Sequence, residues 1–358
     1  MSNLKFHTLQ VADLRRETSD CVSIAFEIPE ELRETFTFKQ GQYITLKTEL
    51  GGQDIRRSYS ICSSPLDKEL RVAVKKVPHG VFSTYANEQL KKGDLLEVMP
   101  PNGRFFTEVG AENEKNYVGF ASGSGITPIM SIMKTVLRSE PKSTFTLFYG
   151  NKNAASVIFR EGIEGLKNKY LERLSVYYIL SRERSDSEIL NGRIDAKKCD
   201  AFCEHFIDVQ TVSDFFLCGP EEMIFSVKEN LEKRGVESKK IHFELFSSAG
   251  SQKAVSQNTN EKQSDTISEV SIKLDGKVMT FGLSGNGLNI LDAALQMGAD
   301  LPYACKGGVC CTCKAKIVEG EVKMDLNYGL EPDEIENKYI LTCQAHPITE
   351  KVVVDFDV

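Results

Sequence analysis

Residues 305–313 read CKGGVCCTC, and one more cysteine follows at Cys343. The first, sixth and ninth of these residues are Cys305, Cys310 and Cys313, so the spacing is C-x4-C-x2-C with a distant fourth thiolate. This is a ligand spacing of [2Fe–2S] clusters, in which cysteine thiolates hold both irons. Because such a cluster carries one electron at a time, we expect an electron source elsewhere in the chain.

The loop has a composition that suits tight wrapping around a cluster. Its sulfurs can converge only if the backbone curls, with some residues at positive φ. Gly307 and Gly308 lie where that conformation is expected, since glycine adopts it at little steric cost. Short side chains elsewhere leave backbone N–H groups free to point at the sulfurs. Cys311 lies off the ligand spacing and is expected not to be a ligand, although an exchange with a neighbouring ligand stays open.

Three other interpretations compete with a cluster. Five cysteines within 39 residues argue against ordinary buried thiols, which are usually scattered. A structural zinc site usually has two short C-x2-C-like pairs, and only Cys310 and Cys313 form one. A Rieske centre needs two histidine ligands, and Cys343 has one such neighbour, His346.

Residues 267–358 resemble a plant-type ferredoxin. Before the cysteine loop, residues 271–280 read as a hairpin with Asp275 and Gly276 at its turn. Residues 289–297 read as a short helix with one apolar face, and Gly298 is a suitable end. The resemblance implies a small β-grasp domain that holds the cluster.

The net negative charge is concentrated in this region. Of the formal net charge of −7, residues 269–358 carry −6, from 14 acidic and 8 basic side chains. An acidic module suits a partner with a basic docking patch, because complementary charge speeds encounter. Acidic surfaces also aid solubility, and composition does not separate the two. No basic stripe points to nucleic-acid binding.

Length and composition are those of a multidomain globular protein. The 358 residues are 41% hydrophobic and 27% charged, which predicts two or three domains. No apolar run approaches the roughly 20 residues needed to cross a bilayer. The first residues have neither a basic n-region nor an apolar h-region. We therefore expect no signal peptide, no membrane association and a cytoplasmic location, where cysteines are thiols or metal ligands.

Changes of pattern divide the chain. Residues 1–110 contain short β-branched and aromatic segments separated by turns, which predicts a small antiparallel β-barrel with helix only at 82–90. Residues 111–247 alternate apolar strands with helical stretches, which predicts a parallel α/β sheet. Residues 248–268 are polar and nearly free of large apolar side chains, which predicts a flexible linker to the last domain, 269–358.

Two motifs in the predicted barrel have the chemistry that a flavin needs. RSYS (57–60) offers a cation for a pyrophosphate, a ring for stacking and hydroxyls for hydrogen bonds. GVFST (80–84) opens the predicted helix, where N–H groups favour an anion. Either motif alone is weak evidence for a flavin site, since an ordinary edge strand also accommodates R-x-Y-S.

Together and in this order, the motifs resemble the ferredoxin–NADP⁺ reductase superfamily, which binds FAD in such a barrel. The resemblance implies that Arg57 binds the pyrophosphate, Tyr59 stacks on the flavin ring and Ser60 reaches its N5 edge. The implied catalytic residues are Ser60, Cys218 and Glu244. The implied flavin contacts are Arg57, Ser58, Tyr59, Ser60, Gly80, Val81, Phe82, Ser83 or Thr84, and Phe246, the last covering the ring.

A second pair of motifs lies in the predicted α/β sheet. SGSGITP (122–128) follows a strand and opens a helix, so its glycines let the backbone approach a diphosphate. It is not the G-x-G-x-x-G fingerprint. CGP (218–220) follows a later strand, where parallel sheets bind ligands. The superfamily has both motifs, which implies nucleotide contacts from Gly123, Ser124, Gly125, Thr127, Pro128, Cys218, Gly219 and Pro220.

The roles of some of these residues stay open. The resemblance places Cys218 near the nicotinamide ring, whereas a small core thiol is the alternative. Ser181 and Arg182 follow another predicted strand, where an arginine can bind a ribose 2′-phosphate. They favour NADPH over NADH, although a solvated charge run has the same composition.

The order of the modules predicts an enzyme that converts two-electron into one-electron transfer. NAD(P)H gives hydride, FAD takes both electrons, and the [2Fe–2S] cluster passes them on singly. The order and the cysteine loop resemble the reductase subunits of the bacterial phenylacetyl-CoA epoxidase family, which implies a di-iron oxygenase component as the electron acceptor. A reductase for a ketosteroid or fatty-acyl hydroxylase or desaturase, and a non-catalytic redox carrier, are the alternatives.

Overall fold

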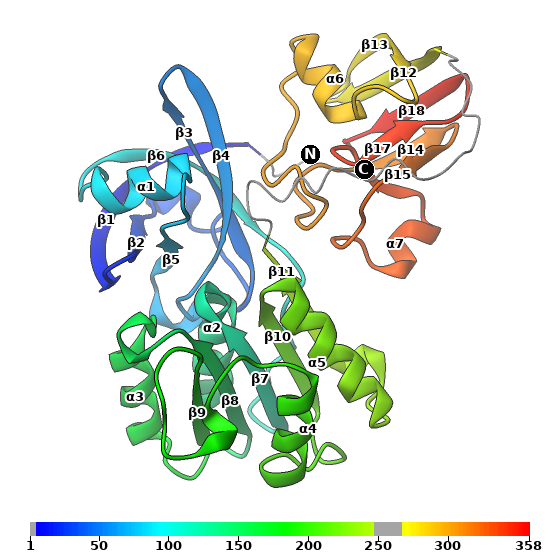
Figure 1. Cartoon of the computed structure of the whole chain (residues 1–358). Helices are drawn as coiled ribbons and strands as arrows, with labels where there is room; N and C mark the ends of the chain where they lie inside the picture. The colour runs from blue at the N-terminus through cyan, green and yellow to red at the C-terminus, as the bar shows by residue number, and fades with distance from the viewer. Residues whose placement is uncertain (1–4, 247–266) are drawn as a thin grey trace.

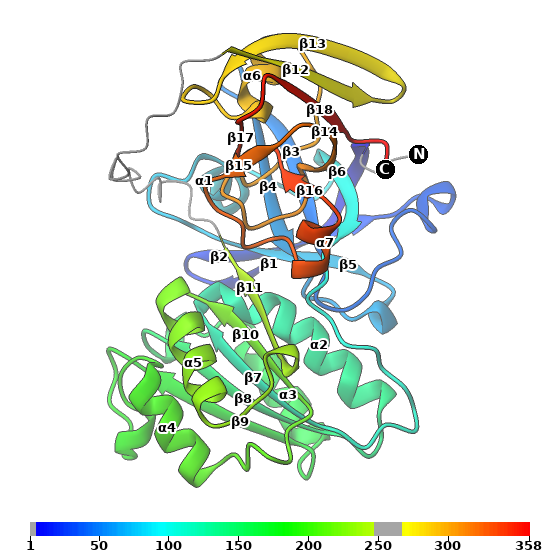
Figure 2. The same cartoon turned by 90° about the vertical axis from the view of Figure 1, so that its right-hand side faces the viewer.

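The computed structural model describes residues 5–246 and 267–358. In chain order they form an N-terminal barrel, an α/β domain and a C-terminal domain (Figure 1). In both views the α/β domain lies below the other two, and the C-terminal domain lies beside the barrel in Figure 1 and largely in front of it in Figure 2. The three-part fold predicted from the sequence is confirmed. The predicted linker lies outside the described residues, except that its last two residues already belong to a strand.

The N-terminal barrel is an antiparallel sheet with the strand order β4-β3-β6-β1-β2-β5. A bridge between Ile61 and Val72 joins its two edges and closes it. Apolar side chains that alternate along the strands fill the interior. The elements are β1 (His7–Thr18), β2 (Cys21–Glu27), β3 (Tyr43–Leu50), β4 (Gln53–Ser60), β5 (Leu70–Lys75), α1 (Val81–Glu88) and β6 (Leu95–Asn102).

The sequence pattern does not predict β1, although it is a long strand of 12 residues. Its register with β2 shifts between Val11 and Asp13 and again between Arg16 and Thr18. A bulge changes which side chains face the core. The alternation of apolar and polar residues that identifies a strand is therefore interrupted.

The α/β domain is a parallel sheet with the strand order β11-β10-β7-β8-β9. Helices α2 and α3 cover one face of the sheet, and α4 and α5 cover the other. Because all strands run the same way, their carboxyl ends meet at one edge. The elements are β7 (Asn116–Ser122), α2 (Ile126–Ser139), β8 (Thr144–Asn151), α3 (Arg160–Lys169), β9 (Leu174–Leu180), α4 (Ala196–His205), β10 (Asp214–Gly219), α5 (Glu221–Lys233) and β11 (Ile241–Leu245).

The C-terminal domain is a mixed sheet with the order β13-β12-β18-β14-β16 and a small β15-β17 ladder. The predicted hairpin is confirmed, since Asp275 and Gly276 turn with φ of 49° and 73°. The predicted short helix is α6, and Gly298 follows its end with φ of 86°. The elements are β12 (Ile267–Leu274), β13 (Lys277–Ser284), α6 (Ile290–Gln296), β14 (Lys314–Glu319), β15 (Val322–Met324), α7 (Pro332–Glu336), β16 (Tyr339–Leu341), β17 (Ala345–Pro347) and β18 (Lys351–Asp355).

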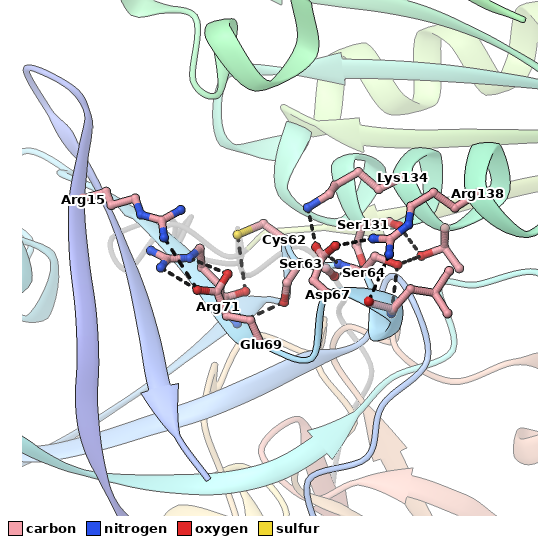
Figure 3. Close-up of polar contacts among 12 residues, drawn as sticks. Arg15, Cys62, Ser63, Ser64, Asp67, Glu69, Arg71, Ser131, Lys134 and Arg138 are labelled. Atoms are coloured by element: carbon pink, nitrogen blue, oxygen red, sulfur yellow. Dashed lines mark hydrogen bonds and ion pairs between the residues drawn. The ribbon is translucent and has the colours of Figure 1, made fainter. Parts of the chain in front are cut away.

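A polar seam joins the barrel to helix α2 (Figure 3). Ser131 donates to the carbonyl of Ser63 at 2.6 Å. Asp67 forms ion pairs with Lys134 and Arg138. Burial opposes ionisation of Asp67, but the bond from Lys134 and the other donors outweigh it and lower the pKa of Asp67. Because α2 begins directly after the glycine loop, the seam fixes that loop relative to the barrel.

Candidate functional site

The four predicted cluster ligands come together as two pairs. Cys305 is paired with Cys310, and Cys343 with Cys313. Interaction with the neighbouring thiol lowers the pKa of Cys305 and Cys343, and the same interaction, together with burial, raises the pKa of Cys310 and Cys313. Within residues 5–246 and 267–358, no three metal-binding side chains converge on one point. Two sulfurs for each of two irons fit a [2Fe–2S] cluster, whereas zinc takes its ligands at one centre.

Backbone donors surround the sulfur of Cys305. The amides of Gly307 and Cys310 donate to it at 3.3 and 3.4 Å. Gly308 has φ of 71°, as predicted, and a Cβ there would meet the Leu326 carbonyl oxygen at 2.9 Å. The prediction for Gly307 is wrong, because Lys306 takes the second positive φ, 50°. Gly307 contributes its amide instead of an unusual backbone angle.

Cys311 faces away from the two thiol pairs. Its thiol donates to the carbonyl of Gly329 at 2.7 Å. Burial raises the pKa of Cys311 to about 11, which keeps the thiol protonated at neutral pH. His346 lies 3.1 Å from Asp325 through Nε2, so its hydrogen bond is to a carboxylate. Both placements favour the four-cysteine ligand set over a ligand exchange or a Rieske centre.

The RSYS motif lies at the end of strand β4. Arg57 and Tyr59 share one face of the strand, and Ser58 and Ser60 share the other. The Tyr59 ring packs against Phe82 with ring centroids 5.5 Å apart. The motif is therefore positioned by the barrel core, with its first three residues half-buried.

The three predicted catalytic residues meet where the barrel joins the α/β domain. Ser60 donates to the carboxylate of Glu244 at 2.6 Å. Glu244 on β11 is the register partner of Cys218 on β10. Burial raises the pKa of Glu244 to about 7, against the lowering effect of the Ser60 bond. Burial, and then the charge of Glu244, raise the pKa of Cys218. Ser60 and Glu244 thus form a direct hydrogen bond across the domain junction, and Cys218 lies next to Glu244 in the sheet.

A cavity of about 420 Å³ lies at the start of helix α1. Gly80, Val81 and Thr84 line it, together with Gly51 of the turn that joins β3 to β4. Phe82 is instead buried in the barrel core, so it supports the helix from within. Ser83 also has a local role, as the next contacts show.

The Ser83 hydroxyl holds the backbone that precedes the helix. It accepts from the Val77 amide at 3.1 Å and donates to the Gly80 carbonyl at 3.2 Å. A Cβ on Gly80 would meet the Val77 carbonyl oxygen at 3.1 Å. Of the two pyrophosphate candidates, Thr84 faces the cavity and Ser83 shapes the turn.

A second cavity, of about 470 Å³, lies where the strands of the α/β domain end. The predicted residues that line it are Gly123, Ser181, Arg182 and Pro220. Asn151 also lines it, and this buried side-chain amide has no hydrogen-bond partner among the described residues. An unpaired buried amide is costly unless a ligand satisfies it. The cavity therefore suits a polar ligand such as a nucleotide.

The glycine loop before α2 is shaped by close packing. Gly123 has φ of 55° and faces the cavity. A Cβ on Gly125 would overlap the carbonyl oxygen of Cys218, so the two nucleotide motifs touch at this glycine. The Thr127 hydroxyl donates to the Ser124 carbonyl at 3.0 Å and closes the first turn of the helix. Two predicted contacts remain. Pro128 lies in that helical turn and Gly219 packs on Met223, so both stabilise the backbone of the loop.

Three cations that the motifs do not include also line this cavity: Lys75, Lys152 and Arg193. Lys152 follows β8 as Arg182 follows β9, so the strand-end rule applied to β8 would have identified it. Lys75 belongs to barrel strand β5, and nothing in its local sequence points to a nucleotide. Clustered cations suit the phosphates of a nucleotide.

Phe246 follows strand β11 and is 39% exposed. It lies two residues after Glu244 in the chain, at the point where the described part of the second domain ends. Its role in covering a flavin ring stays a prediction.

Three domain families match the chain in the order of the three folded parts. The oxidoreductase FAD-binding domain family matches residues 8–107, and the oxidoreductase NAD-binding domain family matches residues 120–229. The 2Fe-2S iron-sulfur cluster binding domain family matches residues 272–347. FAD, a nicotinamide nucleotide and a [2Fe–2S] cluster are thereby confirmed as the cofactors.

Two curated relatives align along nearly the whole chain. A subunit of the 1,2-phenylacetyl-CoA epoxidase of Escherichia coli K12 is 45% identical over 98% of both chains. The ferredoxin reductase component of the 3-ketosteroid-9-alpha-monooxygenase of Rhodococcus rhodochrous is 32% identical over 97% of this chain and 96% of its own. Among solved structures, phthalate dioxygenase reductase covers 98% of both chains with a TM-score of 0.60 and 21% identity, a likeness of fold.

Proposed function

Because this chain belongs to the family of oxygenase reductases that carry FAD, a nicotinamide nucleotide and a [2Fe–2S] cluster, we propose that it reduces the oxygenase component of a phenylacetyl-CoA epoxidase. The observation that carries the choice of partner is the 45% identity to a subunit of that enzyme, against 32% to a 3-ketosteroid monooxygenase reductase. A ketosteroid or related oxygenase is the second candidate.

On the hydride side, the proposal assigns roles to residues that the fold brings together. FAD, when bound, accepts two electrons and releases them one at a time. Arg57 and Thr84 bind its pyrophosphate, and Tyr59 and Ser58 contact the ring system from β4. The cavity at α1 and the half-buried β4 motif support this placement.

Ser60, Glu244 and Cys218 lie where the barrel joins the α/β domain, which we call the catalytic junction. Together they hold and release a proton there. Because burial raises the pKa of Glu244 to about 7, its carboxyl group changes protonation near neutral pH. Ser60 donates to it at 2.6 Å, so the hydroxyl keeps one orientation while the carboxylate is ionised. The high pKa of Cys218 keeps its thiol neutral and compact beside the site.

We propose that the protein prefers NADPH to NADH as its nucleotide. Arg182, Lys152 and Arg193 line the same cavity, and three cations there favour the additional 2′-phosphate. Arg182→Ala is expected to raise the KM for NADPH far more than the KM for NADH in steady-state assays. Equal effects on the two would contradict the assignment, and Lys167→Ala, on helix α3, provides the control.

On the exit side, Cys305, Cys310, Cys313 and Cys343 hold the cluster that faces the acceptor. Reconstitution with the oxygenase subunits of a phenylacetyl-CoA epoxidase, phenylacetyl-CoA and NADPH tests the choice of partner. We expect product formation coupled to NADPH oxidation. Turnover with a 3-ketosteroid oxygenase and none with the epoxidase would select the second candidate.

The proposal includes a cytoplasmic location and the domain limits at residues 110 and 247; the limit predicted at 268 falls inside strand β12, which begins at Ile267. None of the helices in the described residues is long and apolar enough to cross a membrane. All ten cysteines lie in the described residues and none forms a disulfide there; four of them are the proposed cluster ligands. Thiols and metal ligands are the usual states of cysteine in a reducing compartment, which supports the location.

A further inference from the structure

The C-terminal domain rests on the barrel through side chains of three barrel segments. Arg56 of β4, Tyr43 of β3 and Arg104, just after β6, each contact it. The contacts of Arg56 and Tyr43 fall on residues 301–312, within and just before the cysteine loop. The relative position of the two redox domains is therefore specified by side chains.

Arg56 makes the most extensive of these contacts. Its guanidinium donates to the Leu301 carbonyl at 3.2 Å and lies 4.3 Å from the centre of the Tyr303 ring. Asp54 of the barrel holds the guanidinium at 2.9 Å, and the arginine is only 7% exposed. Asp300 lies 3.5 Å away but is 94% exposed, so that pair contributes little. The bonds and the stacking require the planar fork of an arginine.

Tyr43 places the cluster loop close to the catalytic junction. Its ring forms a small buried cluster with Ala304 and Cys310, and its hydroxyl lies 3.4 Å from the Thr312 hydroxyl. In the β3–β4 ladder, Tyr43 is the register partner of Ser60. Side chains of register partners in adjacent strands are immediate neighbours. The cluster ligand Cys310 is thus one side chain away from the residue that contacts Glu244.

We propose that Arg56 is a positioning residue, which holds the iron–sulfur domain in the docked state that receives electrons from the flavin. The proposal rests on the proposed function, since it needs FAD in the barrel and the cluster at the four cysteines. Arg56 directly precedes the RSYS motif on β4 and contacts Leu301 and Tyr303, which lie just before Cys305. When both groups are bound, the flavin would give up the two electrons of one hydride singly, the second after the cluster has passed the first to the oxygenase component, and the proton would go to solvent.

Arg56→Gln in the full-length holoprotein tests this kinetically. We expect stopped-flow reduction of the flavin by NADPH to keep its rate, and reduction of the cluster to slow by about tenfold, the loss that matches one charge-assisted hydrogen bond. Lys47→Gln is the matched control, since Lys47 is paired with Glu97 at 3.1 Å within the barrel domain. Unchanged cluster reduction in Arg56→Gln would overturn the proposal.

Three further variants keep the test decisive if Arg56→Gln folds poorly. Arg56→Lys retains the charge beside Asp54, but a point charge cannot stack on Tyr303 and reach Leu301 together, so slower cluster reduction is expected. Tyr303→Phe keeps the ring and is expected to behave as wild type, whereas Tyr303→Ala is expected to resemble Arg56→Gln. Wild-type rates in both Arg56→Lys and Tyr303→Ala would refute the role of the contact.

A structural readout separates docking from activity. Hydrogen–deuterium exchange of the oxidised holoprotein is expected to rise in residues 299–305 of Arg56→Gln while the barrel core keeps its protection. Unchanged exchange there would contradict the docked contact. Failure of the wild-type protein to reduce ferricyanide with NADPH would instead refute the proposed function, so the two failures are distinguishable.

Discussion

Cys310 and Cys311 are adjacent in the chain but have different partners in the fold. The Cys310 thiol is paired with the thiol of Cys305, whereas Cys311 donates to a backbone carbonyl at 2.7 Å. We expect Cys311→Ser to keep the visible absorption spectrum of the cluster, because a serine hydroxyl can make the same bond. Cys310→Ser is expected to lose or alter the spectrum, since a thiolate ligand is removed. The opposite result for the two variants would reassign the ligand.

Glu244 makes the free energy of unfolding depend on pH. The pKa of Glu244 is raised by burial from 4.5 to about 7, so the folded state binds its proton more tightly than the unfolded state. This contribution to stability is fully present below pH 4.5 and is lost as the pH rises through about 7. We expect the free energy of unfolding of Glu244→Gln to lack this decline.

Denaturant unfolding of the protein without FAD, across this pH range, measures the Glu244 effect. Glu97→Gln is a suitable control, because that carboxylate is 43% exposed and lies on a different strand, β6. A decline of the same size in Glu244→Gln as in wild type would show that another group causes it.

At the level of elements, the close packing of α2 against β10 requires a glycine at position 125, which has no side chain. A Cβ on Gly125 would overlap the Cys218 carbonyl oxygen, which belongs to a strand and cannot yield easily. We expect Gly125→Ala to destabilise the protein by about 2 kcal/mol and to weaken NADPH binding, because both nucleotide motifs must separate. Urea unfolding and nucleotide titration measure the two effects.

Gly165 in helix α3 is a matched control for Gly125. A Cβ there would meet nothing within 4 Å, so Gly165→Ala is expected to be neutral or to stabilise by up to about 1 kcal/mol. Comparable destabilisation by both substitutions would show that the close approach to Cys218 is not the cause.

At the scale of the whole molecule, an ion pair reinforces the docked C-terminal domain. Arg104 pairs at 2.8 Å with Glu334 of helix α7, a carboxylate that is only 4% exposed. We expect Arg104→Gln to slow cluster reduction while flavin reduction is unchanged. Because Arg104 and Arg56 share no partner, their effects on the free energy of docking are expected to add in the double variant. A double variant no slower than the slower single variant would contradict this independence.

The cluster ligands and the three-part fold could be predicted because their signals are local. Ligand spacing, strand alternation and the Asp275-Gly276 turn each depend on a few neighbouring residues. Strand β1 could not be predicted, because its bulges interrupt the alternation. The expectation for Gly307 failed for a related reason, since which residue of a tight loop takes positive φ depends on the contacts around it.

The sequence by itself determined the cofactor chemistry, through cysteine spacing and the order of the motifs. Only the tertiary structure decided which residues meet across domains. Ser60, Glu244 and Cys218 come from strands far apart in the chain, and their contact depends on how the barrel closes and where α2 is held. Arg56 belongs to none of the sequence motifs, and its position against Leu301 and Tyr303 arises from domain packing. Long-range contacts of this kind depend on the whole fold, and no local pattern encodes them.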